Sequence, residues 1–99
     1  MVLYYPQQNE DFDLTIPLDK SSANQGVEEL VVSFRYIDSQ WYLSLWYDGK
    51  FLVQNQTAKS GIDLFSKFSA YKLGKFIIQG DTTSRDCFLN WPVEIGYDA

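Results

Sequence analysis

The sequence lacks histidine and contains a single cysteine, Cys87. Without a second cysteine no disulfide can form within the chain, so we expect a reducing compartment. A catalytic cysteine ordinarily needs a histidine as its base, and this chain has none. Cys87 precedes Phe88 and Leu89, which predicts a small buried hydrophobic residue.

Basic residues are also scarce, with 8 Lys and Arg against 13 Asp and Glu and a net charge of −5. Nucleic acid is therefore not expected as the primary partner, because phosphate binding needs clustered Lys and Arg. The same charge argues against docking on an anionic membrane. No apolar run approaches the roughly 20 residues that span a bilayer, and Met1–Pro6 lacks the pattern of a signal peptide. We expect neither membrane insertion nor secretion.

No grouping of acids predicts catalysis or a metal site. Glu28 and Glu29 are adjacent in a predicted strand, so they point to opposite faces and cannot converge on one substrate atom. The stretch from Asp81 to Asp86 has too few ligands for calcium and includes a cation, Arg85. The expectation is a protein that is not an enzyme, with no catalytic residues, no metal and no cofactor.

Alternating apolar and polar residues are present in abundance, and aromatic residues make up 17% of the chain. In residues 28–37, Leu30, Val32, Phe34 and Tyr36 share one face. In residues 40–47, Trp41, Leu43, Leu45 and Tyr47 do the same. A period of two with one apolar side predicts half-buried strands. Asp38-Ser39 and Asp48-Gly49 predict the hairpin turns, the second strongly.

The whole chain of 99 residues is expected to be one domain (1–99) of the all-β class. We predict a small antiparallel barrel or sandwich. Its six strands would lie at 12–18, 28–37, 40–48, 50–56, 74–79 and 92–97. Pro17 predicts that the first of these is an edge strand or ends there. A loop with one helical turn, pairing Leu64 with Phe68, is expected between residues 58 and 73. Residues 1–11 are interpreted either as a packed edge or as an N-terminal arm that orders on a partner.

Several aromatic residues fall away from the predicted core. Tyr42 and Trp46 lie on the opposite face of their strand, where either another layer covers them or they form a partner surface. Trp91 stands beside a chain break at Pro92, and Tyr4 and Tyr5 lie in the N-terminal segment. We predict a partner interface at Tyr42, Trp46, Trp91, Tyr4 and Tyr5.

A series of short motifs covers nearly the whole chain. In order, they are the strand Phe12–Leu18, Phe34-Arg35-Tyr36, Trp41–Leu45, Asp48-Gly49, Gly61-Ile62-Asp63-Leu64, Leu73–Ile78, Asp81-Thr82-Thr83 and a terminal strand ending near Tyr97. Their order and spacing resemble the small baseplate plug proteins of contractile-tailed bacteriophages. The chain departs from that family where Leu89-Asn90-Trp91-Pro92 stands in place of a Leu-Gly step.

The resemblance implies a structural component of a phage tail baseplate or of a prophage-derived contractile particle. It implies a virion protein, made in the bacterial host cytoplasm, that seals or organises the tail axis near the hub before ejection. Its implied partners are the tail hub, the tube-initiator and other baseplate proteins, and an oligomer in the assembled particle is compatible with this role. The mechanism would be packing rather than catalysis.

Two other classes of function stay open at this point. One is a small β-module that binds carbohydrate or peptide through exposed aromatic residues, which coplanar rings lining a cleft would favour. The other is a small hydrolase that uses scattered acids, which two carboxylates facing each other about 5–10 Å apart would favour.

Overall fold

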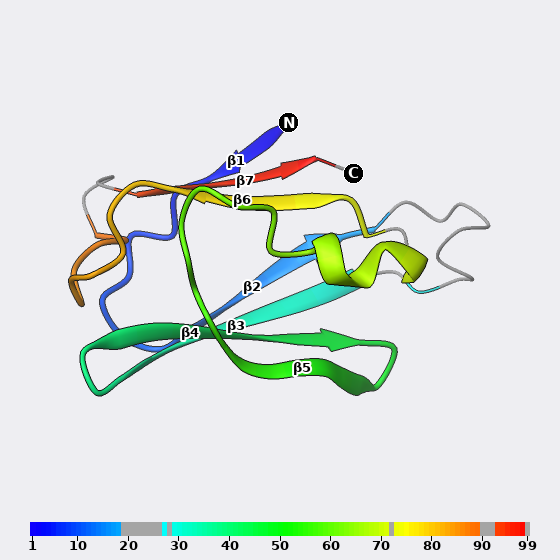
Figure 1. The fold of residues 1–99 in the computed structure, drawn as a ribbon, viewed down its shortest axis with the longest axis horizontal. Coiled ribbons are helices and arrows are strands. Elements are labelled where there is room, and N and C mark those ends of the chain that lie inside the picture. Colours follow the sequence, from blue (N-terminus) through cyan, green and yellow to red (C-terminus); the bar gives the residue numbers. More distant parts are fainter. Residues whose placement is uncertain (19–26, 28, 72, 90–92, 99) are drawn as a thin grey trace.

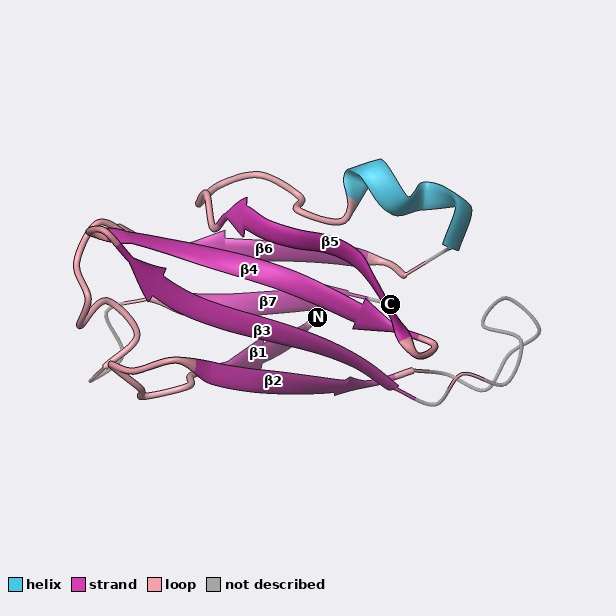
Figure 2. Ribbon diagram, turned by 90° about the horizontal axis from the view of Figure 1, so that it is seen from below, coloured by secondary structure: helices cyan, strands magenta, loops and turns pink. Residues whose placement is uncertain are grey.

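Seven strands form two antiparallel sheets in the computed structural model, which describes residues 1–18, 27, 29–71, 73–89 and 93–98. The three-stranded sheet has the order β1 (Val2–Tyr4), β7 (Glu94–Asp98), β6 (Lys75–Gln79). The four-stranded sheet has the order β2 (Phe12–Pro17), β3 (Glu29–Ile37), β4 (Gln40–Tyr47), β5 (Lys50–Thr57). The sheets form separate layers (Figures 1 and 2). The fold is a sandwich, so of the two predicted architectures the closed barrel is wrong.

The predicted strands are all present, with ends that move by one or two residues within the described chain. Pro17 ends β2, which is an edge strand as predicted. Strand β1 was not among the predicted strands. Residues 28 and 92, predicted to start strands, lie outside the described residues. The predicted helical turn is shifted: a 3-10 helix, η2 (Ser66–Tyr71), begins after Leu64, so the pairing of Leu64 with Phe68 in one turn was wrong.

Both hairpins of the four-stranded sheet close with two-residue turns. Asp48 and Gly49 have φ of 51° and 78°, and Asp38 and Ser39 have φ of 50° and 65°. Positive φ at both central positions defines the type I′ turn, whose twist matches that of paired strands. These turns fix the register in which Val31 lies opposite Trp46.

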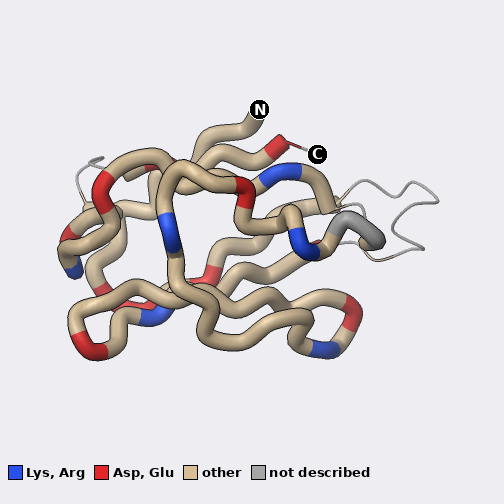
Figure 3. Tube along the Cα trace, in the orientation of Figure 1, with Lys and Arg blue, Asp and Glu red and all other residues tan. Residues whose placement is uncertain are grey.

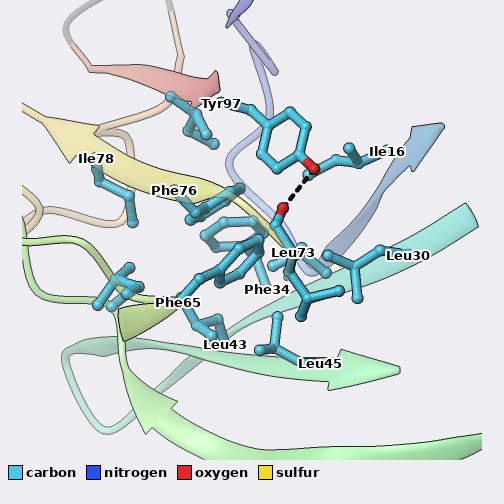
Figure 4. Close-up of a cluster of buried hydrophobic side chains, with 14 of the residues drawn as sticks. Ile16, Leu30, Phe34, Leu43, Leu45, Phe65, Leu73, Phe76, Ile78 and Tyr97 are labelled. Atoms are coloured by element: carbon cyan, nitrogen blue, oxygen red, sulfur yellow. Dashed lines mark hydrogen bonds between the residues drawn. The ribbon is translucent and has the colours of Figure 1, made fainter. Parts of the chain in front are cut away.

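A single apolar core fills the space between the sheets (Figure 4). Phe34 and Leu43 project into it from the four-stranded sheet, and Phe76 and Ile78 from the three-stranded sheet. All four are fully buried. The alternation recognised in the sequence therefore identifies the inward faces correctly, because successive strand residues point to opposite sides.

Phe88 completes the core from a turn rather than from a strand. Its ring makes edge contacts with those of Trp41, Phe34 and Phe12, with centroids 5.1, 5.4 and 5.5 Å apart. Cys87, beside it, is 3% exposed, which confirms the prediction of a buried hydrophobic role. The turn is held by the Trp41 indole N–H, which donates to the Ser84 carbonyl at 3.1 Å.

The segment after β5 crosses from one sheet to the other and lies along the outer edge of β6 (Figure 1). The Gly61 N–H donates to the Ile78 carbonyl at 2.9 Å, and the Leu64 N–H donates to the Phe76 carbonyl at 2.8 Å. Asp63 forms an isolated bridge with Ile77. This pairing covers an edge that would otherwise be open to other strands.

Candidate protein-interaction surface

A row of side chains crosses the outer face of the four-stranded sheet. The register places Thr15 opposite Val31, Val31 opposite Trp46, and Trp46 opposite Phe51. Side chains in such a cross-strand row lie close enough to pack. Val31, Trp46 and Phe51 are the apolar members, and we call these three the Trp46 surface.

The Trp46 and Phe51 rings contact each other edge to face. Their centroids are 4.8 Å apart and their planes meet at 79°. Trp46 is nevertheless 39% exposed and Phe51 44% exposed. The pair is therefore held in place by a ring contact while part of its apolar area faces solvent.

Trp46 is an interface residue predicted from the sequence, whereas Phe51 was not predicted. A signal for Phe51 was present in the turn. A two-residue loop at Asp48-Gly49 pairs the residues that flank it, so Trp46 must lie opposite Phe51. Alternation along β4 places Trp46 on the outer face, whereas the length of the turn is needed to identify Phe51 as its cross-strand neighbour.

A hollow of about 280 Å³ adjoins the Trp46 surface at the end of β4 that precedes the hairpin turn. It opens to solvent and is lined by Val27, Glu29, Val31, Trp46, Asp48 and Gly49. Its lining thus combines one tryptophan with two acidic residues. Elsewhere, acidic and basic residues are spread over the described chain rather than gathered in one patch (Figure 3).

Tyr42 lies on the same outer face as Trp46, with Ser44 between them on β4. It is half-buried and stands opposite Arg35 on β3 and Thr57 on β5. Ser44 is buried, and its Oγ accepts a hydrogen bond from the Asn55 N–H at 3.0 Å. A row of small and polar residues therefore separates Tyr42 from the apolar Trp46 surface.

The other predicted interface residues lie elsewhere. Tyr4, on β1, is half-buried and packs against the core. The Tyr5 hydroxyl donates to Glu94 Oε2 at 2.9 Å, and this bond is the main cause of a raised Tyr5 pKa. Trp91 lies outside the described residues. The structure thus brings Tyr42 and Trp46 to one face and places Tyr4 and Tyr5 with the three-stranded sheet.

A second exposed apolar group occurs at β1. Met1, Val2 and Leu3 are all exposed, and Leu3 lies opposite Gly96 on the neighbouring strand β7. A Cβ on Gly96 would come within 2.8 Å of the Met1 sulfur, so the glycine makes room for this side chain.

Cys87 and Asp81 also have shifted pKa values, each with a structural cause. Burial raises the pKa of Cys87 to about 11. The pKa of Asp81 is lowered because its carboxylate accepts hydrogen bonds from the hydroxyl and N–H of Thr83. Within the described residues, no group of three or more potential ligands could hold a metal. No helix there has the length and apolar character needed to cross a bilayer.

Comparison with known proteins adds no family assignment. No protein-family model matches the chain, and the search of curated proteins finds no match.

Proposed function

We propose that this protein is a non-catalytic structural component of a contractile phage tail baseplate. It acts as a plug that packs against proteins of the hub and tube axis. The observation that carries this proposal is the exposed aromatic pair of Trp46 and Phe51 on the outer face of the four-stranded sheet. Exposed apolar groups of this kind mark partner surfaces, and tryptophan is enriched among the residues that dominate binding. The order of motifs along the chain supports the choice of assembly.

The roles of the motifs support a function by packing. In Gly61-Ile62-Asp63-Leu64, the backbone covers the edge of β6. In Leu73–Ile78, Leu73 and Phe76 enter the core. In Asp81-Thr82-Thr83, the buried Thr82 hydroxyl donates to the Ala58 carbonyl at 3.2 Å. Each motif builds the sandwich, which leaves the outer aromatic residues available for a partner.

The geometry gives less support to a carbohydrate module. A sugar ring stacks on flat, coplanar aromatic surfaces, whereas the rings of Trp46 and Phe51 meet at 79°. Tyr42 is separated from them by the row that contains Ser44. An edge-to-face pair presents a ridge instead of a platform, which suits an apolar contact with another protein.

Size-exclusion chromatography with mass measurement tests the proposal. The purified chain is run alone and then mixed with the tail-hub and tube-initiator proteins of the same genome. We expect co-elution as a defined complex. The variant W46S/F51S should fold normally by circular dichroism and weaken the complex at least tenfold, because both side chains are exposed aromatic contacts.

The matched control is I37S/I62S. Ile37 and Ile62 are 42% and 46% exposed, close to the values for the aromatic pair. Ile37 is the last residue of β3, at the opposite end of that strand from Val31, and Ile62 lies in the segment beside β6. This control should leave the complex unchanged. A chain that stays monomeric in every mixture would refute the baseplate role. Equal losses from both double variants would refute the Trp46 surface as the contact.

A further inference from the structure

The hollow beside Trp46 combines features that match one side-chain chemistry. We propose that it receives an arginine side chain from a protein partner. This inference rests on the proposed packing function and names the chemistry of its contact. At about 280 Å³ the hollow is slightly smaller than the usual range of volumes for small-molecule sites. A single long side chain suits this space better than a cofactor or a chain of sugars.

The aromatic wall supplies the first part of the match. Trp46 lines the hollow and is 39% exposed, while its ring makes an edge-to-face contact with that of Phe51. Tryptophan is the best aromatic partner for a cation held over its face. A planar guanidinium stacks on such a ring more effectively than the compact ammonium of lysine.

The two carboxylates supply the second part. The register that pairs Leu30 with Tyr47 brings Glu29 and Asp48 to the same end of the β3–β4 pair, and both line the hollow. Neither carboxylate makes a hydrogen bond or ion pair with another described residue. Both are exposed, so their charges are available to a partner. An arginine guanidinium can donate two parallel hydrogen bonds to one carboxylate, which a lysine ammonium does not do in this fixed geometry.

Charge and composition disfavour other occupants. An anionic group would meet two carboxylates in a chain of net charge −5. A metal ion would find only these two acids among the lining residues, and no described group of three potential ligands exists. The apolar residues Val27 and Val31 instead suit the methylene stem of a long cationic side chain.

The probe is the blocked tripeptide acetyl-Gly-Arg-Gly-amide, titrated into the isotope-labelled protein and followed by NMR. We expect the shifts to concentrate on the Trp46 indole N–H, the Gly49 amide and Val31, and the affinity to fall as salt is raised. The corresponding lysine peptide should bind at least threefold more weakly. The leucine and glutamate peptides should produce no such shifts.

The double variant E29Q/D48N removes both charges and should weaken arginine binding at least fivefold. Asn accepts positive φ readily, so the type I′ turn at Asp48 is preserved. The matched control D13N/D38N removes one strand charge and one turn charge elsewhere, with Asp38 at φ 50° as Asp48 is at 51°. Binding by the control should stay within twofold of wild type.

The outcomes separate this inference from the proposed function. Arginine shifts no larger than leucine shifts, lysine binding equal to arginine, or E29Q/D48N binding like wild type would each overturn the arginine assignment. The complex with hub and tube proteins would still stand if W46S/F51S alone abolished it. Arginine binding that depends on Glu29 and Asp48, in a chain that ignores those proteins, would support the hollow's chemistry and refute the baseplate role.

Discussion

The Asp63 carboxylate fastens the crossing segment to the backbone of Phe76. Its Oδ1 accepts a hydrogen bond from the Phe76 N–H at 3.0 Å and a second from the Phe65 N–H at 3.0 Å. The rings of Phe65 and Phe76 stack beneath this contact, with centroids 4.8 Å apart. One side chain therefore sets the position of two core aromatic residues and of the edge of β6.

Replacing Asp63 with alanine should destabilise the sandwich by about 2–3 kcal/mol, because two backbone donors lose a charged acceptor. D63N retains an Oδ1 acceptor and should lose less. Urea unfolding followed by tryptophan fluorescence measures both. The control D13A removes an exposed carboxylate for which no hydrogen bond to a described residue is found, and should change stability by about 0.5 kcal/mol or less. Equal effects of D63A and D13A would contradict this role.

The Tyr97 hydroxyl donates to the Leu73 carbonyl across the core (Figure 4). Y97F leaves this buried carbonyl without its donor and should cost about 1–2 kcal/mol. Burial is the main cause of a raised Tyr97 pKa, from an ordinary value of 10.0.

That raised pKa has a definite consequence for stability. The Tyr97 hydroxyl keeps its proton to a higher pH in the folded state than in the unfolded state. The stabilisation is therefore complete below the ordinary tyrosine pKa and is lost as pH rises through the folded value. Unfolding free energies measured from neutral pH to above the ordinary pKa should fall more steeply for wild type than for Y97F. Parallel curves would contradict this assignment.

Much of the fold follows from local sequence signals, because side chains alternate between the two faces of a strand and a type I′ turn requires positive φ at its two central residues. The inward positions of Phe34 and Leu43 follow from alternation, and the Asp48-Gly49 turn follows from its requirement for positive φ. The choice between barrel and sandwich does not follow, since it depends on which distant strands pair. Strand β1 is only three residues long, and it gains its partner from the other end of the chain.

The candidate surface was predictable only in part. The outer face of Trp46 follows from alternation, and Phe51 follows once the turn length is used. The meeting of Glu29 and Asp48 at one end of the β3–β4 pair also follows from a turn, because Asp38-Ser39 sets the register of that hairpin. The hollow itself does not follow, because the space between side chains depends on packing that no short motif encodes.

Phe88 should be the most sensitive core position outside the strands. Its ring contacts Trp41, Phe34 and Phe12, and F88A would leave a cavity between the sheets at a cost of about 3–5 kcal/mol. F88L fills more of that space and should cost considerably less. Denaturant midpoints of the two variants measure the difference. A midpoint for F88A within error of wild type would show that this turn is not part of the cooperative core.

Cys87 should be chemically inert while the protein is folded. The thiolate is the reactive form, and burial both limits access and raises the Cys87 pKa to about 11. At about pH 8, the native protein should react with a disulfide reagent such as DTNB far more slowly than a free thiol does. On unfolding in urea, the rate should rise to that of a free thiol. A surface-cysteine variant, S39C, provides the accessible control. Native Cys87 reacting as fast as S39C would show that the turn carrying Phe88 opens freely from the folded state.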